Sequence, residues 1–388
     1  MSTVRLYDKD SHIKEFGSQV VSCVAKGEFY ETVLAETAFF PEGGGQPADT
    51  GRIDDANVLD VQIREGIIYH MTDAPLAVGS AVVGKLDWEQ RLRRMQNHSG
   101  EHVVSGLVNR LYGYNNVGFH MGKDDVTMDF DGELNLEQLR EIELMANRVV
   151  AENVRITARY PSPSALKRMK YRSKLDLESD VRIVTIEGYD KCACCAPHVK
   201  RTGQIGMIKL LDFLRYKGGV RIHLQCGLDA LDDYNRKYDN ISRISCTLSA
   251  KQHLTADAVE RLVAELSDKK YELAQAKRQI AVMKASQLEP SEANICVFES
   301  DMPADGLREI ANIGAQICGG VCAVFSGNDE NGYNYVIASK DSELSGVAKS
   351  INEAVCGRGG GRGTMIQGSA KADRKTIEEF FKNTVIKG

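Results

Sequence analysis

Hydrophobic and polar residues alternate along the first part of the chain with the period expected of β-strands. From residue 27 to residue 88, short runs rich in β-branched and aromatic residues are separated by Gly, Asp and Pro turns. These runs predict strands at 29–37, 58–63, 67–71 and 81–86. Because the strands are short and closely spaced, we expect residues 1–88 to form a small β-barrel.

The pattern then changes to the 3–4 spacing of an amphipathic helix. The recurring apolar residues are Leu92, Met95, Val103, Leu107 and Leu111. They predict a partly buried helix over 89–111. Further elements are expected as strands at 126–130, 154–160, 181–187, 205–211 and 220–224, and as a helix at 136–152. Residues 89–227 should therefore form an α+β domain.

Two long amphipathic segments follow this domain. Apolar residues at helical spacing predict helices over 231–248 and 259–283. We expect them to pack as an antiparallel, coiled-coil-like helical hairpin within residues 228–289, which ends at a linker near Pro290.

The last part of the chain alternates strand and helix patterns again. Strands are predicted at 295–298, 321–326 and 333–339, and helices at 305–318, at 343–355 and at the end of the chain. Residues 290–388 should form a separate small α/β domain, so the whole chain is expected to be a multidomain α+β protein.

Composition favours a cytoplasmic protein that does not enter a membrane. The chain has 388 residues, 43% of them hydrophobic, but no run of 18 apolar residues and a polar start. Ten scattered cysteines are typical of metal ligands and buried thiols rather than of a disulfide framework. A net charge of −5 argues against general binding of polyanions.

Two local clusters of basic residues stand out against this negative charge. The first contains Arg91, Arg93 and Arg94, and the second contains Lys167, Arg168, Lys170, Arg172 and Lys174. Each is either a solvated helix face or a contact for a phosphate backbone, and the sequence favours neither interpretation.

Two pairs of metal-ligand residues have the same spacing. His98 and His102 lie one turn apart on the predicted helix, so both imidazoles can reach one ion. Cys194 and His198 repeat the spacing far downstream, in a cysteine-rich loop that should leave a strand. Three imidazoles and one sulfur suit Zn²⁺ better than Mg²⁺ or Ca²⁺, so we expect one zinc site. The alternative is a polar helix face and a loop of buried thiols.

Two glycine-rich segments are candidates for ligand binding. Gly43, Gly44 and Gly45 precede Gln46 in a turn over 39–51, and glycines permit positive φ angles and close approach to a ligand. Arg358 and Arg362 flank three glycines in a segment expected to be a loop between two helices. The amides and guanidinium groups of this second segment can hold phosphate. The alternative for the turn over 39–51 is a flexible surface loop, and the alternative for the second segment is a tight turn.

Taken in order, these motifs resemble a known family. The turn at 39–51, His98-x-x-x-His102, Cys194-x-x-x-His198 and Thr-Gly-Gln-Ile-Gly at 202–206 are similar to the freestanding alanyl-tRNA editing proteins, the AlaX family. Segment 217–222, the hairpin and the C-terminal glycines extend the resemblance to the long form, whose last domain is of the DHHA1 type found in alanyl-tRNA synthetase. It covers the chain from about residue 27 onward, with no counterpart of the ATP-dependent activation domain.

One departure from the family pattern affects the sulfur ligand. Where the synthetases have Cys-Gly-Gly-Thr-His, this chain has Cys194-Cys195-Ala196-Pro197-His198. Cys192 and Cys195 are therefore alternative ligands, and Cys194 is chosen because it preserves the spacing to His198.

The resemblance implies hydrolysis of the ester in tRNA(Ala) mischarged with serine and, as a second substrate, glycine. Thr37 and Gln46 match pocket positions of the family, and Thr37 is expected to bind the serine hydroxyl. Glu101 is a candidate general base or a carboxylate that orients a histidine. The zinc can activate water, polarise the ester or anchor the substrate. The C-terminal part is expected to form a homodimer and to bind tRNA.

Two other functions compete with this interpretation. Residues 98–102 also fit the inverted zincin pattern H-x-x-E-H, which predicts a metallopeptidase with Glu101 as base, a third carboxylate ligand and an open zinc. A non-catalytic tRNA-binding or dimerisation protein with a structural zinc is the second, because a closed set of four ligands is typical of structural sites.

Overall fold

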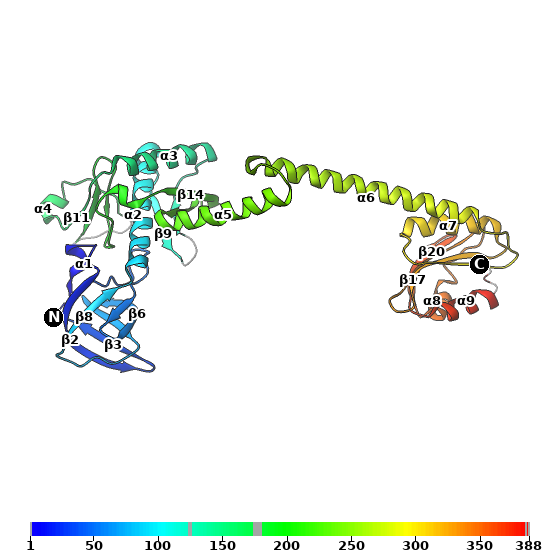
Figure 1. The fold of residues 1–388 in the computed structure, drawn as a ribbon, viewed down its shortest axis with the longest axis horizontal. Helices are drawn as coiled ribbons and strands as arrows, with labels where there is room; N and C mark the ends of the chain where they lie inside the picture. Colours follow the sequence, from blue (N-terminus) through cyan, green and yellow to red (C-terminus); the bar gives the residue numbers. More distant parts are fainter. Residues whose placement is uncertain (1, 123–125, 174–180, 385, 387–388) are drawn as a thin grey trace. The chain divides into compact units, whose positions relative to one another are not determined.

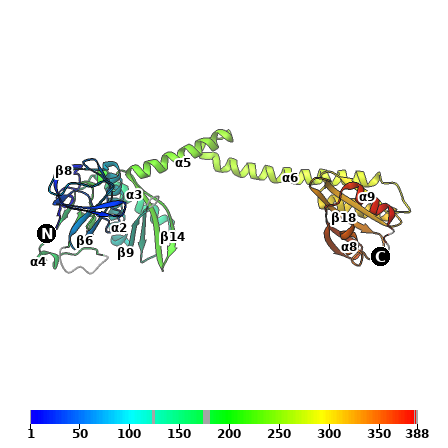
Figure 2. The same ribbon diagram turned by 90° about the horizontal axis from the view of Figure 1, so that it is seen from below.

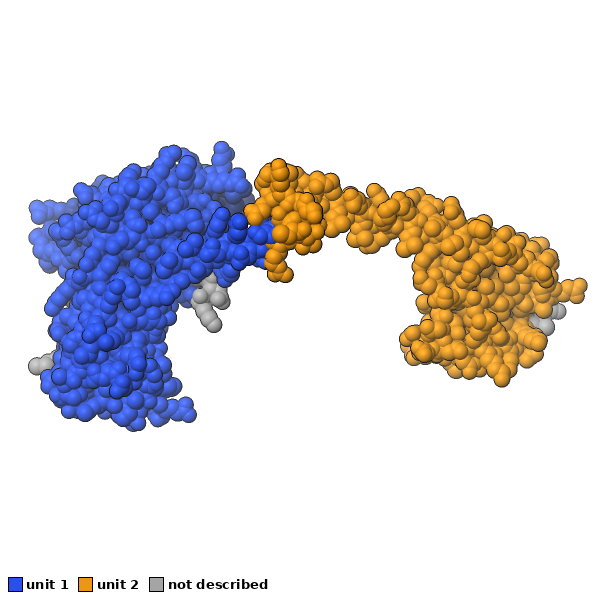
Figure 3. Space-filling model, viewed as in Figure 1, with its two compact units in different colours: residues 1–242 blue, residues 243–388 orange. Residues whose placement is uncertain are grey.

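The computed structural model describes residues 2–122, 126–173, 181–384 and 386. The chain forms two compact units, residues 1–242 and 243–388 (Figure 3). The first contains two hydrophobic cores that are both next to Cys194, and the second contains two further cores. The multidomain α+β class is confirmed. Lys174 of the second basic cluster lies outside the described residues.

The first unit begins with strands that hydrogen-bond in a closed barrel, in the order β2-β3-β7-β6-β5-β8 (Figure 1). Their bounds are β2 (Glu15–Lys26), β3 (Phe29–Leu34), β5 (Gly51–Ile53), β6 (Ala56–Arg64), β7 (Ile67–Thr72) and β8 (Ala81–Leu86). Short elements precede or interrupt it: β1 (Val4–Arg5), α1 (Leu6–Lys9) and β4 (Glu36–Thr37). The sequence pattern missed β2, where only Phe16 and Val20 are fully buried.

Helix α2 (Trp88–Tyr112) follows the barrel and carries the two spaced histidines. The Asp87 side chain accepts the Gln90 N–H at 3.2 Å at its start, and Gly113 ends it with a φ of 73°. Every residue from Met95 to Val108 is buried. The sequence predicted burial of one face only, whereas this helix is enclosed on all sides over its central turns.

Two sheets and a second long helix surround α2. One sheet has the order β14-β15-β10-β9, with β9 (Asn116–Met121), β10 (Val126–Phe130), β14 (Ile208–Tyr216) and β15 (Gly219–Cys226). The other has the order β11-β12-β13, with β11 (Ile156–Arg159), β12 (Ile183–Ile186) and β13 (Asp190–Ala193). The remaining elements are α3 (Leu136–Glu152), α4 (Pro163–Leu166) and the 3-10 helix η1 (Thr202–Ile205).

Two long helices come next, as predicted: α5 (Gly227–Thr247) and α6 (Thr255–Ser286), with a 3-10 turn η2 (Gln252–Leu254) between them. The apolar seam of α6 is solvent-exposed along most of its length, with Leu262 at 50%, Leu266 at 53% and Leu273 at 57% exposure. Its buried residues are Thr255 and Ala258 at the start and Ala281 and Ala285 near the end, where the last two pack into a core with α7. Packing of the two helices as a hairpin stays a prediction.

The second unit is built on a sheet of order β16-β17-β18-β20-β19, with α6 and α7 on one face and α8 and α9 on the other (Figure 2). Its elements are β16 (Ile295–Glu299), α7 (Ala304–Ile317), β17 (Val321–Asn328), β18 (Gly332–Ser339), α8 (Ala348–Ala354), β19 (Arg358–Arg362), β20 (Met365–Ala370) and α9 (Arg374–Asn383).

The prediction of a loop between two helices at the Arg358–Arg362 segment is wrong, because these residues form the exposed edge strand β19. The glycines explain the strand: a Cβ at Gly359 would lie 2.4 Å from the Gln367 carbonyl oxygen, and one at Gly361 would lie 2.1 Å from that of Met365. Their missing side chains let β19 approach β20 closely.

Among the described helices, none combines the length and the apolar character needed to cross a bilayer.

Candidate metal centre

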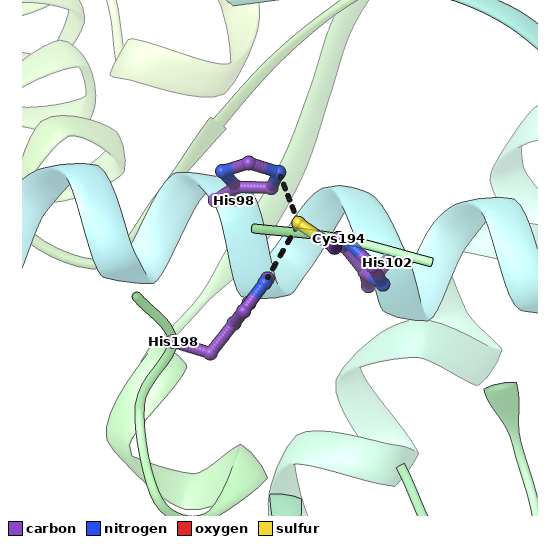
Figure 4. A group of neighbouring side chains, drawn as sticks. All are labelled: His98, His102, Cys194 and His198. Carbon is purple, nitrogen blue, oxygen red and sulfur yellow. Dashed lines mark hydrogen bonds between the residues drawn. The ribbon is translucent and has the colours of Figure 1, made fainter. Parts of the chain in front are cut away.

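Four side chains from two distant segments meet beside α2. His98 and His102 project from one face of that helix, and Cys194 and His198 lie in the loop after β13 (Figure 4). The Cys194 Sγ is 3.5 Å from the His98 Nε2 and 3.4 Å from the His198 Nε2. One ligand atom of each of the four residues lies within 4.8 Å of the others.

These separations fit a tetrahedral zinc ion. With Zn–S near 2.3 Å and Zn–N near 2.0–2.1 Å, a tetrahedral angle places sulfur and nitrogen about 3.6 Å apart. The nitrogens are also correctly directed, because each histidine uses its Nδ1 on an outer oxygen and turns its Nε2 inward. At 3.0 Å each, the pairs are His98 with Gln46 Oε1, His102 with Asp190 Oδ2 and His198 with Ser99 Oγ.

The electrostatic surroundings give His198 and Cys194 the protonation states in which these side chains bind metal. Burial lowers the pKa of His198 to about 3, which keeps this imidazole neutral. Burial opposes ionisation of Cys194, but the nearby His98 and His198 hold the pKa of its thiol well below the usual value. Burial also opposes protonation of His102, yet its hydrogen bond to Asp190 holds that pKa well above the usual value. A thiolate and neutral imidazoles are the forms that bind metal, so a bound ion would displace a proton from His102.

The three neighbouring cysteines have different surroundings. Cys194 contacts the inward nitrogens of His98 and His198. Cys192 is buried in a separate group with His102 and Asp190, and burial raises the pKa of its thiol. Cys195 is exposed as a residue, but its sulfur packs beside Gly43 and Gly44, and this desolvation raises the pKa of its thiol to about 11. The geometry therefore favours Cys194 among the three sulfur candidates.

Glu101 lies next to the group without joining it. Its Oε1 accepts hydrogen bonds from Ser105 Oγ at 2.6 Å and from the Asn116 side-chain amide. Its Oε2 lies 3.8 Å from His102 Nε2. The ligands that complete this group are a thiol and an imidazole, whereas a metallopeptidase of the inverted zincin type needs a third carboxylate. The arrangement thus disfavours the peptidase interpretation.

The Gly-rich turn packs directly against the centre. Gly45 has a φ of 81°, and a Cβ there would lie 2.4 Å from the carbonyl oxygen of Phe119. The Phe119 ring in turn packs against the His98 ring, with centroids 4.7 Å apart and an interplanar angle of 37°. Gly43 and Gly44 run beside the Cys195 sulfur. The glycines therefore allow the backbone of the turn to pack close to the centre.

Gln46 connects the turn to the metal ligands and has an unused donor. The side chain is fully buried, and its Oε1 faces the His98 Nδ1. Its Nε2 is buried without a hydrogen-bond partner among the described residues. A buried donor without a partner is costly, and at a functional site it commonly marks the position of a ligand acceptor.

Thr37 is placed differently. Its side chain is fully buried in the barrel, where its Oγ1 lies 2.9 Å from His70 Nε2 and accepts the Phe39 N–H at 3.1 Å. These hydrogen bonds are with His70 and Phe39, and neither joins Thr37 to the four ligands.

Most of the basic cluster on α2 is used within the protein. Arg91 is buried against Asp49, Arg93 is paired with Glu89, Asp229 and Asp232, and Arg94 donates to the Ala48 carbonyl. Arg172 from the second cluster is paired with Asp190. Arg358 and Arg362 are exposed on β19 of the other unit.

Sequence reasoning missed Asp190, Ser99 and His70. Ser99 lies between the two histidines of the motif, so the motif itself could have indicated that Ser99 lies near the metal ligands. Asp190 and His70 had no local signal, because their partners lie 88 and 33 residues away in the sequence.

Three family models match the chain. The model described as the threonyl and alanyl tRNA synthetase second additional domain matches residues 181–245, which include Cys194 and His198. The DHHA1 domain matches residues 292–385. A model described as tRNA synthetases class II (A) matches residues 5–90, which fold as the barrel and its flanking segments.

Curated relatives of two kinds match the chain. The Alanyl-tRNA editing protein Aarsd1 of Rattus norvegicus is 27% identical over 94% of this chain and 93% of its own length. The Alanyl-tRNA editing protein AlaX-L of Pyrococcus horikoshii is 32% identical over 60% of each chain. The Alanine--tRNA ligase of Pyrococcus furiosus is 30% identical over 98% of this chain, which spans only 43% of the ligase. Among solved structures, the C-Ala domain of Aquifex aeolicus alanyl-tRNA synthetase matches 23% of this chain and 87% of that one, at 19% identity and a TM-score of 0.20. The resemblance indicated by the motifs is confirmed: along nearly its whole length, this chain is similar to proteins named alanyl-tRNA editing proteins.

Proposed function

We propose that the protein is a cytoplasmic trans-editing hydrolase that deacylates tRNA(Ala) mischarged with serine, and with glycine as a second substrate. Relatives named alanyl-tRNA editing proteins, matched over nearly their whole length, support this proposal. The observation that carries it is the meeting of three imidazoles and one thiol beside the unpartnered amide of Gln46.

The cofactor we propose is one Zn²⁺ per chain, held by His98, His102, Cys194 and His198. The donor types and the sulfur–nitrogen separations of 3.4 and 3.5 Å support zinc. Bound zinc would supply a Lewis acid for the ester carbonyl, for water or for the aminoacyl group.

Gln46 is proposed to bind the substrate through its free Nε2. This amide N–H₂ is aimed away from His98, because the Oε1 of the same side chain faces the His98 ring. An ester carbonyl or a serine hydroxyl can accept its hydrogen bond. The glycines at 43–45 hold the turn that carries Gln46, so we assign them to the same binding site.

Thr37 is proposed to select for serine as an acceptor. Because a carbonyl oxygen can only accept, the His70 Nδ1, 3.0 Å from the Thr32 carbonyl, must carry the proton. Burial lowers the pKa of His70 to about 4, so its Nε2 is unprotonated at neutral pH and accepts the Thr37 hydroxyl proton. The Thr37 Oγ1 can therefore only accept a hydrogen bond from a substrate hydroxyl.

Glu101 is proposed as the general base. Its Oε1 is held by Ser105 and Asn116, while its Oε2 lies on the side of the inward nitrogen of His102. A fixed carboxylate at this position can accept a proton from water near the centre.

For the C-terminal part we propose homodimerisation and tRNA binding. The exposed apolar seam of α6 needs a partner surface, which a second copy can supply. Arg358 and Arg362, exposed on the edge strand β19, are the proposed phosphate contacts.

One observation favours a second candidate function. Four protein ligands occupy all four coordination positions of a tetrahedral zinc ion. Sites without an open position are usually structural. A non-catalytic protein that binds tRNA, dimerises and carries a structural zinc has the same ligand set.

Deacylation assays separate these candidates. Purified protein is incubated with seryl-, glycyl- and alanyl-tRNA(Ala), with and without a chelator, and the metal content of H98A and C194A is measured beside that of wild type. The hydrolase predicts loss of seryl-tRNA(Ala) that stops in chelator, and loss of zinc in both variants. Intact seryl-tRNA(Ala) with zinc bound would favour the structural alternative. Zinc retained in C194A alone would assign the sulfur ligand to Cys192 or Cys195.

A further inference from the structure

His102 differs from the other two histidines in the chemical group that forms a hydrogen bond with its Nδ1. Its Nδ1 faces a carboxylate oxygen of Asp190, whereas His98 faces an amide oxygen and His198 faces a hydroxyl. Both His102 and Asp190 are buried, with side-chain exposures of 3% and 2%. We propose that Asp190, fixed by Arg172, is the positioning residue that orients His102 toward the metal.

The hydrogen bond determines which nitrogen of His102 is free. An ionised carboxylate can only accept, so the proton of the neutral imidazole must lie on Nδ1, and the lone pair must lie on Nε2. Because Nδ1 is bonded to Asp190, Nε2 is the nitrogen of His102 that is left for the metal. Asp190 therefore fixes both the tautomer and the rotation of the His102 ring.

Arg172 holds Asp190 in this position. Its Nε lies 2.8 Å from Asp190 Oδ1, and its Nη2 lies 2.9 Å from Oδ2, which is the fork geometry of a bidentate pair. The backbone of Arg172 is itself bound to β13, donating to the Lys191 carbonyl at 2.7 Å and accepting from the Ala193 N–H at 2.8 Å. The strand register thus places the guanidinium group beside the carboxylate.

A glycine on α2 allows the strand carrying Asp190 to come this close. Gly106 follows His102 by one turn, on the same face of the helix. A Cβ at Gly106 would lie 2.7 Å from the Tyr189 carbonyl oxygen and 2.8 Å from the Asp190 Cβ. Any side chain at this position would push the β12–β13 hairpin away from α2 and lengthen the bond to His102.

This inference rests on metal binding at the proposed site, and zinc affinity tests it without any deacylation assay. The full chain is stripped of metal, and its Kd for Zn²⁺ is measured by competition with a chromophoric chelator for wild type, D190N and R172Q. D129N is the matched control, because Asp129 forms an equivalent bidentate pair with Arg221 at 2.7 Å, away from the ligands.

We expect D190N to bind Zn²⁺ about 10- to 100-fold more weakly than wild type. R172Q should lose less, because Asp190 still reaches His102, and D129N should stay within about twofold of wild type. Equal affinity of D190N and D129N would overturn the inference while leaving the metal site intact. Absence of zinc binding by the wild-type chain would overturn both.

A second variant covers the case in which D190N fails to fold. G106A keeps both charges and displaces the hairpin, so it should also weaken zinc binding by about tenfold or more. Folded G106A protein with wild-type zinc affinity would equally refute the role of Asp190.

Discussion

The ion pair between Arg91 and Asp49 should contribute more to stability than any exposed pair in the barrel. Their side chains are 0% and 2% exposed, and the Arg91 Nε lies 2.9 Å from both Asp49 oxygens. Arg91 also donates to the carbonyls of Ser11 and Ala38, while Asp49 accepts the Phe40 N–H at 2.6 Å. The pair therefore ties helix α2 to the chain at Ser11 and Ala38 and to the Gly-rich turn over 39–51, which contains Asp49.

Removing one partner leaves the other charge buried without compensation. We expect R91M and D49N each to lower the free energy of unfolding by about 3–5 kcal/mol. The double variant R91M/D49N should be more stable than the sum of the two single losses predicts, because no isolated charge remains. K85M is the control: Lys85 and Glu15 are 3.1 Å apart in the same barrel but 64% and 59% exposed, so the loss should not exceed about 1 kcal/mol.

Urea unfolding followed by tryptophan fluorescence provides the assay. The chain has one tryptophan, Trp88, at the start of α2, and its ring lies 4.7 Å from the Lys14 Nζ. Its signal therefore reports on the contact between the barrel and α2. A loss below about 1 kcal/mol in R91M, equal to that of K85M, would refute the reasoning.

Three further predictions concern other parts of the chain. Burial lowers the pKa of His70 from 6.5 to about 4, so below pH 6.5 the unfolded chain takes up a proton that the folded chain excludes. The free energy of unfolding should therefore fall by about 3 kcal/mol as pH drops from 6.5 to 4. In the Trp88 assay, H70Q should show a shallower dependence of this free energy on pH, and an unchanged dependence would contradict the prediction. G45A should destabilise the first unit by more than G79A, because both glycines have positive φ angles but only a Cβ at Gly45 meets neighbouring atoms. Equal losses in the free energy of urea unfolding would exclude the close contact as the cause. L266E should shift the protein from dimer to monomer in light scattering, because it puts a charge into the exposed seam of α6; an unchanged mass would remove that seam from the interface.

Local spacing explains what could be predicted from the sequence. His98 and His102 share a helix face by geometry alone, and the identical spacing of Cys194 and His198 supplied the rest of the ligand set. Helix α2 was placed to within a residue or two for the same reason. Its burial on all sides was not predictable, because the polar residues that interrupt its apolar pattern are bonded to distant segments.

Long-range packing explains what the sequence could not show. Asp190 orients a histidine 88 residues earlier, and nothing in its neighbourhood indicates this. The strand β19 was mistaken for a loop because its glycines have low strand propensity, whereas here they permit close pairing with β20. Arg172 belonged to a basic run that the sequence left open between a solvated face and a phosphate contact, and the fold places it against Asp190.

The proposed function requires that the four-residue centre hold zinc for deacylation, and a zinc titration of activity measures this dependence. Metal-stripped protein is titrated with Zn²⁺ while the initial rate of seryl-tRNA(Ala) hydrolysis is measured. We expect the rate to rise from background and to level off at about one zinc per chain, with no such rise in C194A. Full activity in the metal-stripped protein, or seryl-tRNA(Ala) that stays intact at every zinc concentration, would contradict the account.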